Sequence, residues 1–401
     1  MRILYVIQRY GKDIAGGAEQ HCREFAERLS GRGHDVEVLT TCATSYVDWA
    51  NDYRPGITHE RGVVVRRVPV ARKRDGELFG RLNARLLHRH RLAPVELQRE
   101  WMRTQGPYAP ALPRWLRRNA SAYDCIVFVT YLYWTTWAGL SALAGAHPTL
   151  LHPTAHAEPP LRLSLFDELF HLPDGFAFLT PEEAALVASR FPSAPAGEVV
   201  GMGVALPTST KGTLFRGRAG LGREPYLLYL GRVDPAKGAA ELVDYFVAYK
   251  DRNPSNLKLV LVGASVMDLP VRPDIVHAGF VEDEVRDSAI AGALALVNPS
   301  YFESFSMVLT EAFAQGRTAL VQARCDVLAG HARRSGAAIP YSGFAEFAAA
   351  VEMLHTDPRL AAELGARGRE YIRREYDWGS TLERYEALLM RVANARAVAA
   401  I

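Results

Sequence analysis

The stretch LLYLGRVDPAKG, residues 227–238, decides the interpretation of this chain, because it predicts an apolar strand that runs into a glycine turn and then into a helix. Arg232 and Lys237 flank the turn. The start of a helix offers unpaired backbone N–H groups and a partial positive charge, and two added cations strengthen its preference for anions. The stretch therefore predicts a site for a phosphorylated ligand at the end of a strand.

A second stretch, NPSYFESFSMVLTEAFAQG at residues 298–316, completes this predicted site. Glu303 and Glu311 are separated by seven residues across a loop and the start of a helix. Eight helical steps cover about 12 Å. One carboxylate can therefore contact a sugar hydroxyl while the other contacts a ribose, with a diphosphate between them at the helix start.

Together and in this order, the two stretches resemble the retaining family 4 glycosyltransferases of the GT-B fold, and the likeness covers essentially the whole chain. Either stretch alone is weak evidence, since a glycine before a helix is common and a Glu pair at this spacing is usually a solvated helix face. The resemblance implies the catalytic residues His156, Arg232, Lys237 and Glu303. It implies donor contacts from Gly16, Gly17, Gly231, Arg232, Lys237, Glu303, Ser304, Phe305, Ser306 and Glu311.

The loop at Glu303 departs from the family pattern. Many members carry glycines beside this glutamate, as in E-G-F-G, whereas this chain reads ESFSM. Serines still offer backbone N–H groups to a phosphate. Their side chains either narrow the pocket or hydrogen-bond the sugar, so the identity of the donor stays open.

Length and composition predict a folded, soluble protein of two or three domains, with 401 residues of which 49% are hydrophobic. A net charge of +3 is too slight to indicate nucleic-acid binding. The four cysteines lack the paired spacing of zinc or redox motifs, and we expect them to be reduced and structural. The short apolar run at the N-terminus and the lack of any uncharged apolar stretch of 18 residues predict a cytoplasmic protein without signal peptide or spanning helix.

Apolar strands alternate with helices twice along the chain, which predicts two doubly wound α/β domains. First-domain strands are expected at residues 3–7, 36–39, 63–68, 125–129, 149–151 and 175–179. Glycines and a proline at 199–207 indicate a boundary. The predicted domains are 1–203 on the acceptor side and 204–378 on the donor side, both Rossmann-like. The resemblance implies that they face each other across a cleft, and that a C-terminal helix in 379–401 crosses back onto the first domain.

The loop AGGAEQH, residues 15–21, is the first domain's strand-to-helix turn. Gly16 and Gly17 lack a Cβ, which permits positive φ and close approach to a ligand, although a bare pair of glycines is more often a plain turn. The resemblance implies that the loop faces the donor diphosphate. Glu19 and His21 are weaker candidates, because Glu19 also suits the first turn of any helix.

The stretch LLHPTAHAEPPL, residues 150–161, supplies two histidines at a strand end, where α/β sites usually lie. The resemblance implies that His156 hydrogen-bonds the donor sugar. His152 is either a packed structural histidine or a site residue. Many family members have an acidic residue directly after the histidine, whereas this chain has Ala157 and then Glu158, and the role of Glu158 stays open.

Residues 63–91 form the one clear basic cluster. Its cations are Arg66, Arg67, Arg72, Lys73, Arg74, Arg81, Arg85, Arg89 and Arg91, and its apolar residues Leu78, Phe79, Leu82, Leu86 and Leu87 share roughly one helical face. The segment is either a solvated helix packed on its own domain or a surface for an anionic membrane or lipid diphosphate acceptor. Trp49 and Tyr53 in the preceding loop can stack on a sugar ring or anchor the loop.

These features predict a glycosyltransferase that moves a sugar from a nucleoside diphosphate donor to a sugar, glycolipid or polysaccharide acceptor. The resemblance implies retention of configuration, no divalent metal and no cofactor, and a place in polysaccharide or glycolipid biosynthesis at or near the inner membrane face. Two alternatives stay open: a nucleotide-sugar epimerase of the same fold, and a silent nucleotide-sugar-binding protein. Product analysis without acceptor distinguishes the three.

Overall fold

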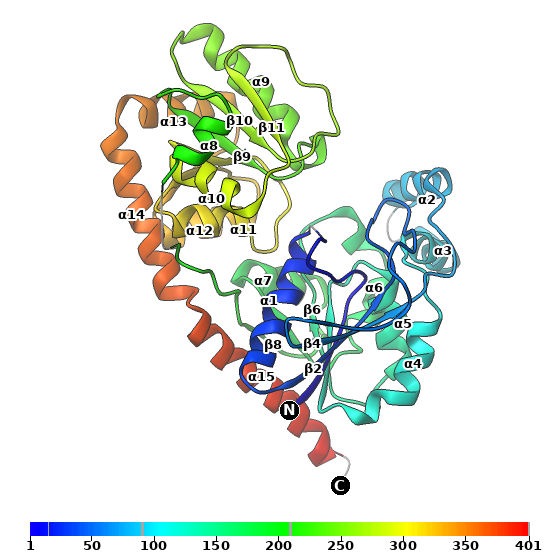
Figure 1. Cartoon of the computed structure of the whole chain (residues 1–401). Coiled ribbons are helices and arrows are strands. Elements are labelled where there is room, and N and C mark those ends of the chain that lie inside the picture. Colours follow the sequence, from blue (N-terminus) through cyan, green and yellow to red (C-terminus); the bar gives the residue numbers. More distant parts are fainter. Residues whose placement is uncertain (15, 90–91, 208–210, 400–401) are drawn as a thin grey trace. The chain divides into compact units, whose positions relative to one another are not determined.

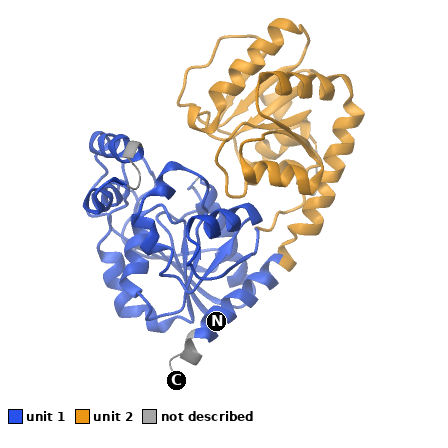
Figure 2. Ribbon diagram, turned by 180° about the vertical axis from the view of Figure 1, so that it is seen from behind, with its two compact units in different colours: residues 1–201, 381–401 blue, residues 202–380 orange. Residues whose placement is uncertain are grey.

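A computed structural model of the chain describes residues 1–14, 16–89, 92–207 and 211–399. It divides into two compact units, which Figure 2 colours separately. Unit 1 comprises Met1–Gly201 with Thr381–Ile401, and unit 2 comprises Met202–Ser380. The sequence placed the boundaries after residues 203 and 378, and the acceptor and donor roles of the two domains stay predictions.

Unit 1 is built on an eight-stranded sheet of order β3-β4-β2-β1-β5-β6-β7-β8. Among the described strands, β3 alone is antiparallel to its neighbour. The strands are β1 (Arg2–Val6), β2 (Asp35–Thr41), β3 (Gly56–Glu60), β4 (Val63–Val68), β5 (Cys125–Val129), β6 (Thr149–His152), β7 (Gly175–Phe178) and β8 (Gly197–Val199).

The central strand β1 shows why this sheet is covered on both faces, since each of its residues from Ile3 to Val6 is fully buried. Leu4 and Val6 join the large core cluster formed with the helices α3 to α6. Tyr5 points to the opposite face and donates a hydrogen bond to the Tyr385 hydroxyl of the C-terminal helix. The helices therefore form layers on both sides of the sheet (Figure 1).

Helix α7 of unit 1 begins at a clear start signal in the sequence. Before α7, the Thr180 hydroxyl accepts the Glu183 N–H and Pro181 occupies the first helical position. The helices are α1 (Gly17–Gly31), α2 (Gly76–Arg89), α3 (Val95–Gln105), α4 (Ala111–Asn119), α5 (Trp134–Leu143), α6 (Leu165–Leu169) and α7 (Pro181–Arg190), with the short turns η2 (Ala120–Ala122) and η3 (Pro159–Arg162).

Unit 2 has a six-stranded parallel sheet of order β11-β10-β9-β12-β13-β14. Its strands are β9 (Tyr226–Leu230), β10 (Lys258–Val262), β11 (Ile275–Gly279), β12 (Ala295–Asn298), β13 (Thr318–Gln322) and β14 (Ala338–Tyr341). Its helices are α8 (Thr213–Arg218), α9 (Ala239–Arg252), α10 (Asp283–Gly292), α11 (Met307–Ala314), α12 (Asp326–Ser335), α13 (Phe344–Thr356) and α14 (Pro358–Glu375), with the turn η4 (Pro235–Lys237). The predicted pair of doubly wound α/β domains is confirmed.

The C-terminal helix α15 (Trp378–Ala399) begins in the last residues of unit 2 and continues as part of unit 1. Its Tyr385 hydroxyl lies 2.8 Å from His152 Nε2, and its Glu386 carboxylate pairs with Arg32 and His34. These contacts bind the helix to the first domain, as the resemblance implied.

Candidate active site

The two stretches that the sequence analysis joined lie at the same edge of the second sheet. Strands β9 and β12 are parallel neighbours, so the loops that follow them emerge side by side. The backbones touch at Gly238, where an added Cβ would lie 2.3 Å from the Pro299 carbonyl oxygen and where φ is +76°. Only glycine fits this position without strain.

The turn after β9 carries both predicted cations, although the helix starts later than expected. The short turn η4 ends at Lys237, and α9 begins at Ala239 after the left-handed Gly238. The Arg232 Nε donates to Asp234 Oδ2 at 2.7 Å. The Lys237 Nζ reaches across to Glu303 Oε1 at 3.3 Å. Both cationic side chains are more than a third exposed, which leaves them accessible to a ligand.

The two glutamates contact different cations. Glu303 lies beside Lys237, whereas Glu311 on α11 lies 4.0 Å from Arg286 Nη2 on α10. Arg286 also pairs with Asp283 and Asp287. Sequence reasoning missed Arg286, because neither its spacing from Glu311 nor its own helix marks it as a partner of the site.

The loop between Glu303 and α11 is held in an unusual backbone conformation. Ser306 precedes α11 with φ of +68°, in the left-handed region where glycine is favoured. Asn298 at the end of β12 donates from Nδ2 to the Ser306 Oγ at 2.8 Å, and its Oδ1 accepts the Ser300 N–H. Asn298 therefore stabilises the shape that glycine would adopt unaided. In the sequence, the signal for this role was an asparagine at the end of an apolar run.

Phe305 takes a different place from the one predicted for it. Its ring is buried and packs edge-on against His331 and Tyr376. The carbonyl of Phe305 accepts a hydrogen bond from His331 Nε2 at 2.9 Å, and burial lowers the pKa of His331 to about 3. The side chain of Phe305 therefore belongs to the interior of unit 2, and the donor contact stays a prediction for its backbone.

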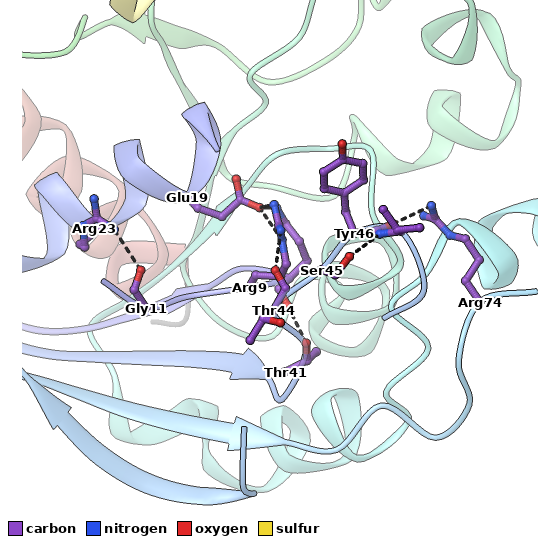
Figure 3. A network of polar contacts seen from close by, with 11 residues as sticks. Arg9, Gly11, Glu19, Arg23, Thr41, Thr44, Ser45, Tyr46 and Arg74 are labelled. Atoms are coloured by element: carbon purple, nitrogen blue, oxygen red, sulfur yellow. Dashed lines mark hydrogen bonds and ion pairs between the residues drawn. The ribbon is translucent and has the colours of Figure 1, made fainter. Parts of the chain in front are cut away.

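A buried ion pair between Arg9 and Glu19 lies beside the start of α1 (Figure 3). Glu19 Oε1 accepts from Arg9 Nε, Arg9 Nη2 and Gln8 Nε2. An added Cβ at Gly16 would lie 2.2 Å from Glu19 Oε2, so the glycine makes room for this carboxylate. Gly17 is the first residue of α1. The Glu19 carboxylate therefore already forms an ion pair with Arg9. The sequence analysis had named Glu19 as a weaker candidate for ligand contact.

The histidines His21 and His152 form a buried chain with two tyrosines. His152 Nδ1 lies 3.0 Å from His21 Nε2, and Tyr385 links His152 to Tyr5. Burial lowers the pKa of His21 to about 3 and holds the pKa of His152 well below its usual value. Of the two interpretations of His152, the packed structural histidine is the one that the structure supports, and His21 has the same character.

His156 lies in the loop between β6 and η3. Its Nδ1 is 3.6 Å from Glu158 Oε1, and the Tyr131 hydroxyl donates to the same oxygen at 2.7 Å. The backbone N–H of Ala155 donates to the buried Glu183 carboxylate at 2.6 Å. Thr154 has φ of +47°, which costs on the order of 1 kcal/mol and persists because the surroundings fix it. The loop is therefore held on both sides of His156.

The basic segment is partly built into unit 1. The Arg74 guanidinium donates to the carbonyls of Thr104, Gln105 and Tyr46 and lies between the rings of Trp49 and Phe79. Burial lowers its pKa to about 10. Arg74 therefore holds loops together and is not available to a membrane, while Arg91 lies outside the described residues.

The apolar face of α2 is covered by unit 1 itself. Leu82 and Leu86 are buried in the main core cluster, and Leu78 and Phe79 pack against it. This face is therefore not free to enter a membrane. Trp49 is also buried and donates from Nε1 to the Gln105 carbonyl, so it anchors the loop instead of stacking on a sugar.

Across residues 1–14, 16–89, 92–207 and 211–399, no cluster of three or more His, Cys, Asp or Glu side chains is placed to hold a metal ion. Within the same ranges, none of the helices combines the length and apolar character needed to cross a membrane. The four cysteines are buried and free of disulfides, as the sequence predicted.

Comparison with known proteins finds similar chains for both the second unit and the whole protein. Residues 224–357, which include both stretches of the site, match the family model of glycosyl transferases group 1. The D-inositol 3-phosphate glycosyltransferase of Arthrobacter sp. (strain FB24) is 27% identical over 422 residues, which cover 95% of this chain and 92% of that protein.

Solved structures share the fold of the whole chain. Sucrose-phosphate synthase from Thermosynechococcus elongatus superposes with a TM-score of 0.72 at 18% identity, covering 98% of this chain and 100% of the other. Anabaena HepE in complex with UDP and glucose gives 0.70 at 16% identity, with 97% and 99% covered. The chain therefore carries a glycosyl transferases group 1 domain in unit 2 and is a glycosyltransferase of the GT-B fold.

Proposed function

We propose that this protein transfers a sugar from a nucleoside diphosphate sugar to an acceptor hydroxyl, with retention of configuration and without a divalent metal. Arg232, Lys237 and the backbone N–H groups before α11 bind the diphosphate. Glu303 binds hydroxyls of the sugar, and Glu311 binds the ribose. In unit 1, Gly16 and Gly17 allow the backbone to approach the diphosphate and His156 hydrogen-bonds the sugar.

The contact between Lys237 and Glu303 carries this proposal. It joins a cation that suits a phosphate and a carboxylate that suits sugar hydroxyls, from two loops that meet at the carboxyl edge of one sheet. As the glycosidic bond breaks, negative charge grows on the leaving diphosphate. Preorganised cations and a helix start stabilise that charge, which is the role that metal ions have in other sites. The leaving phosphate can then accept the acceptor proton during attack from the same face.

The relatives suggest which substrates to test first. One similar structure holds UDP and glucose, and the names of two relatives refer to phosphorylated sugars or inositol. We therefore propose UDP-sugars as first donors. Sugar phosphates join the sugar, glycolipid and polysaccharide acceptors as candidates, in a cytoplasmic pathway of polysaccharide or glycolipid assembly.

The test is turnover of a panel of nucleoside diphosphate sugars, with and without acceptors, followed by NMR of the anomeric proton in donor and product. We expect acceptor-dependent release of the nucleoside diphosphate, retained configuration and unchanged rates after treatment with EDTA. Inversion would refute the retaining mechanism, and loss of activity with EDTA would refute metal independence. Binding without any turnover would favour the silent alternative.

Contact with a membrane is a separate part of the proposal, supported by exposed cations of the basic segment. Arg72 and Lys73 are exposed, although Lys73 lies 3.7 Å from Asp48. Each cation near an anionic surface contributes up to about 1 kcal/mol, screened within about 10 Å at moderate salt. Replacing both with Gln should reduce sedimentation with vesicles rich in anionic lipid, whereas Arg114→Gln and Arg117→Gln should not. A wild-type protein that ignores such vesicles at low salt would exclude this contact.

A further inference from the structure

We propose that Glu158 is a positioning residue, which fixes the ring of His156 so that Nε2 accepts a hydrogen bond from a hydroxyl of the donor sugar. The contact with the sugar hydroxyl rests on the proposed function. The orientation of the His156 ring by Glu158 is a property of the protein without ligand. Directly after His156 the chain has Ala157, and the next carboxylate along the chain is that of Glu158. The structure places the carboxylate of Glu158 beside the ring of His156.

The Glu158 oxygen that lies near His156 is anchored by a buried tyrosine. Tyr131 at the end of β5 donates its hydroxyl hydrogen to Glu158 Oε1 at 2.7 Å. The Tyr131 ring is buried and packs against Phe166 and Phe170. Burial, reinforced by Glu158, raises the pKa of Tyr131 well above its usual value, so the hydroxyl stays a donor. The carboxylate oxygen therefore has a fixed position.

The histidine is brought to this oxygen by its own backbone. The Glu158 N–H donates to the His156 carbonyl at 2.6 Å, which folds the two side chains toward the same side. The Ala155 N–H donates to Glu183, and the Tyr131 N–H donates to the Pro153 carbonyl. The loop is thus restrained before and after His156. His156 Nδ1 and Glu158 Oε1 are 3.6 Å apart, and a rotation of the histidine ring that shortens this distance forms a hydrogen bond.

The chemical consequence follows from the two nitrogens of a neutral imidazole. A carboxylate accepts but cannot donate, so the nitrogen beside it carries the hydrogen. With Nδ1–H directed at Glu158, Nε2 keeps its lone pair and accepts a hydrogen bond. A sugar hydroxyl is a suitable donor to that lone pair. Its own oxygen then gains electron density and can accept from other groups in the site.

The first test measures the tautomer of His156 without any ligand. Protein labelled with 15N in its histidines is examined by NMR at about pH 8.5, two units above the usual histidine pKa, and His156→Asn identifies the signal. We expect the Nδ1–H form in the wild type and a shift toward the Nε2–H form in Glu158→Gln. Glu168→Gln, an exposed carboxylate on α6, should change nothing. An Nε2–H form in the wild type, or no change in Glu158→Gln, would overturn the proposal.

The second test is a double-mutant cycle on turnover of UDP-glucose. Losing the partner that orients a metal-bound histidine typically costs about 10- to 100-fold in metal affinity or activity, and we expect a loss at the lower end of this range for His156. Glu158→Gln should lower kcat/KM by about tenfold in the wild type and by less than about twofold in the His156→Ala background, with UDP affinity unchanged. An equal loss in both backgrounds would show that Glu158 acts independently of His156 and would refute the positioning role. If no nucleotide sugar is turned over while the tautomer result holds, the proposed function fails and the effect of Glu158 on the ring stands.

Discussion

The turns that follow β1 and β9 use similar residues for opposite purposes. Each turn follows a buried parallel strand and contains an arginine, a glycine and then a helix with a glutamate in its first turn. In unit 1 the arginine and glutamate neutralise each other, with side chains that are 7% and 6% exposed. In unit 2, Arg232 and Lys237 are 39% and 44% exposed, and Lys237 reaches a glutamate from another loop.

This difference distinguishes a turn whose ion pair holds the fold from a turn whose cations we propose to bind the diphosphate. A buried pair is worth little beyond its desolvation cost, but losing one partner leaves an uncompensated charge. An exposed pair contributes little to stability and can exchange its partner for a ligand. The exposure of Arg232 and Lys237 is therefore the reason why we propose the turn after β9 as the anion site.

The largest expected effect concerns turnover at the exposed turn. Arg232→Ala or Lys237→Ala should lower transfer by roughly two to four orders of magnitude, on the scale of losing one preorganised charge contact to a transition state. Thermal stability should change little. Arg223→Ala, at an exposed arginine before β9, is the matched control and should keep normal turnover. Near-wild-type turnover in either test variant would contradict the phosphate assignment.

The buried turn should show the reverse pattern, with the loss in stability. Arg9→Met leaves the Glu19 carboxylate buried without its cation, and we expect the free energy of unfolding to fall by about 3–5 kcal/mol in urea titrations. The double variant Arg9→Met with Glu19→Gln should recover most of this loss. A single variant as stable as the wild type would show that the pair does not hold the turn.

The two glutamates of unit 2 sharpen the assignment of the binding turn. Glu311→Gln should weaken binding of free UDP by about 10- to 100-fold, as expected for hydrogen bonds to a charged group, because substrate and product share the ribose. Glu303→Gln should impair sugar turnover and leave UDP binding nearly intact. Calorimetry with UDP beside turnover of UDP-glucose measures both, and the opposite pattern would reverse the two roles.

The last prediction concerns the pH dependence of stability, which reports on the buried His331 and not on the exposed site. The pKa of His331 is about 3 in the folded protein and about 6.5 when unfolded, so below pH 6.5 the unfolded chain binds an extra proton. The contribution of His331 to stability is complete above pH 6.5 and falls by about 1.4 kcal/mol per pH unit as pH drops toward 3. His331→Gln should therefore flatten this part of the stability curve in urea titrations. An unchanged slope would mean that His331 is protonated in the folded state.

Much of the fold was predictable because buried parallel strands are continuous apolar runs. The strands β4 and β5 begin and end where they were expected, and four others differ from the prediction at one or both ends. The strands β3 and β8 were missed, since their residues are largely exposed and carry no apolar run. Edge strands such as β3 are defined by hydrogen bonds to a neighbour, which a local pattern does not encode.

By itself, the sequence determined the two α/β domains and the residue types of the site, because strand, turn and helix signals are local. Its resemblance to the family 4 glycosyltransferases indicated the glycosyltransferase class. The tertiary structure decided what each charged or aromatic residue does. Lys237 meets Glu303 across 66 residues, Arg9 is neutralised by Glu19, Arg74 supports loops, and Phe305 turns inward. Exposure and partners arise from contacts between distant segments, and these contacts fix whether a charge is free to bind a ligand or is used to hold the fold.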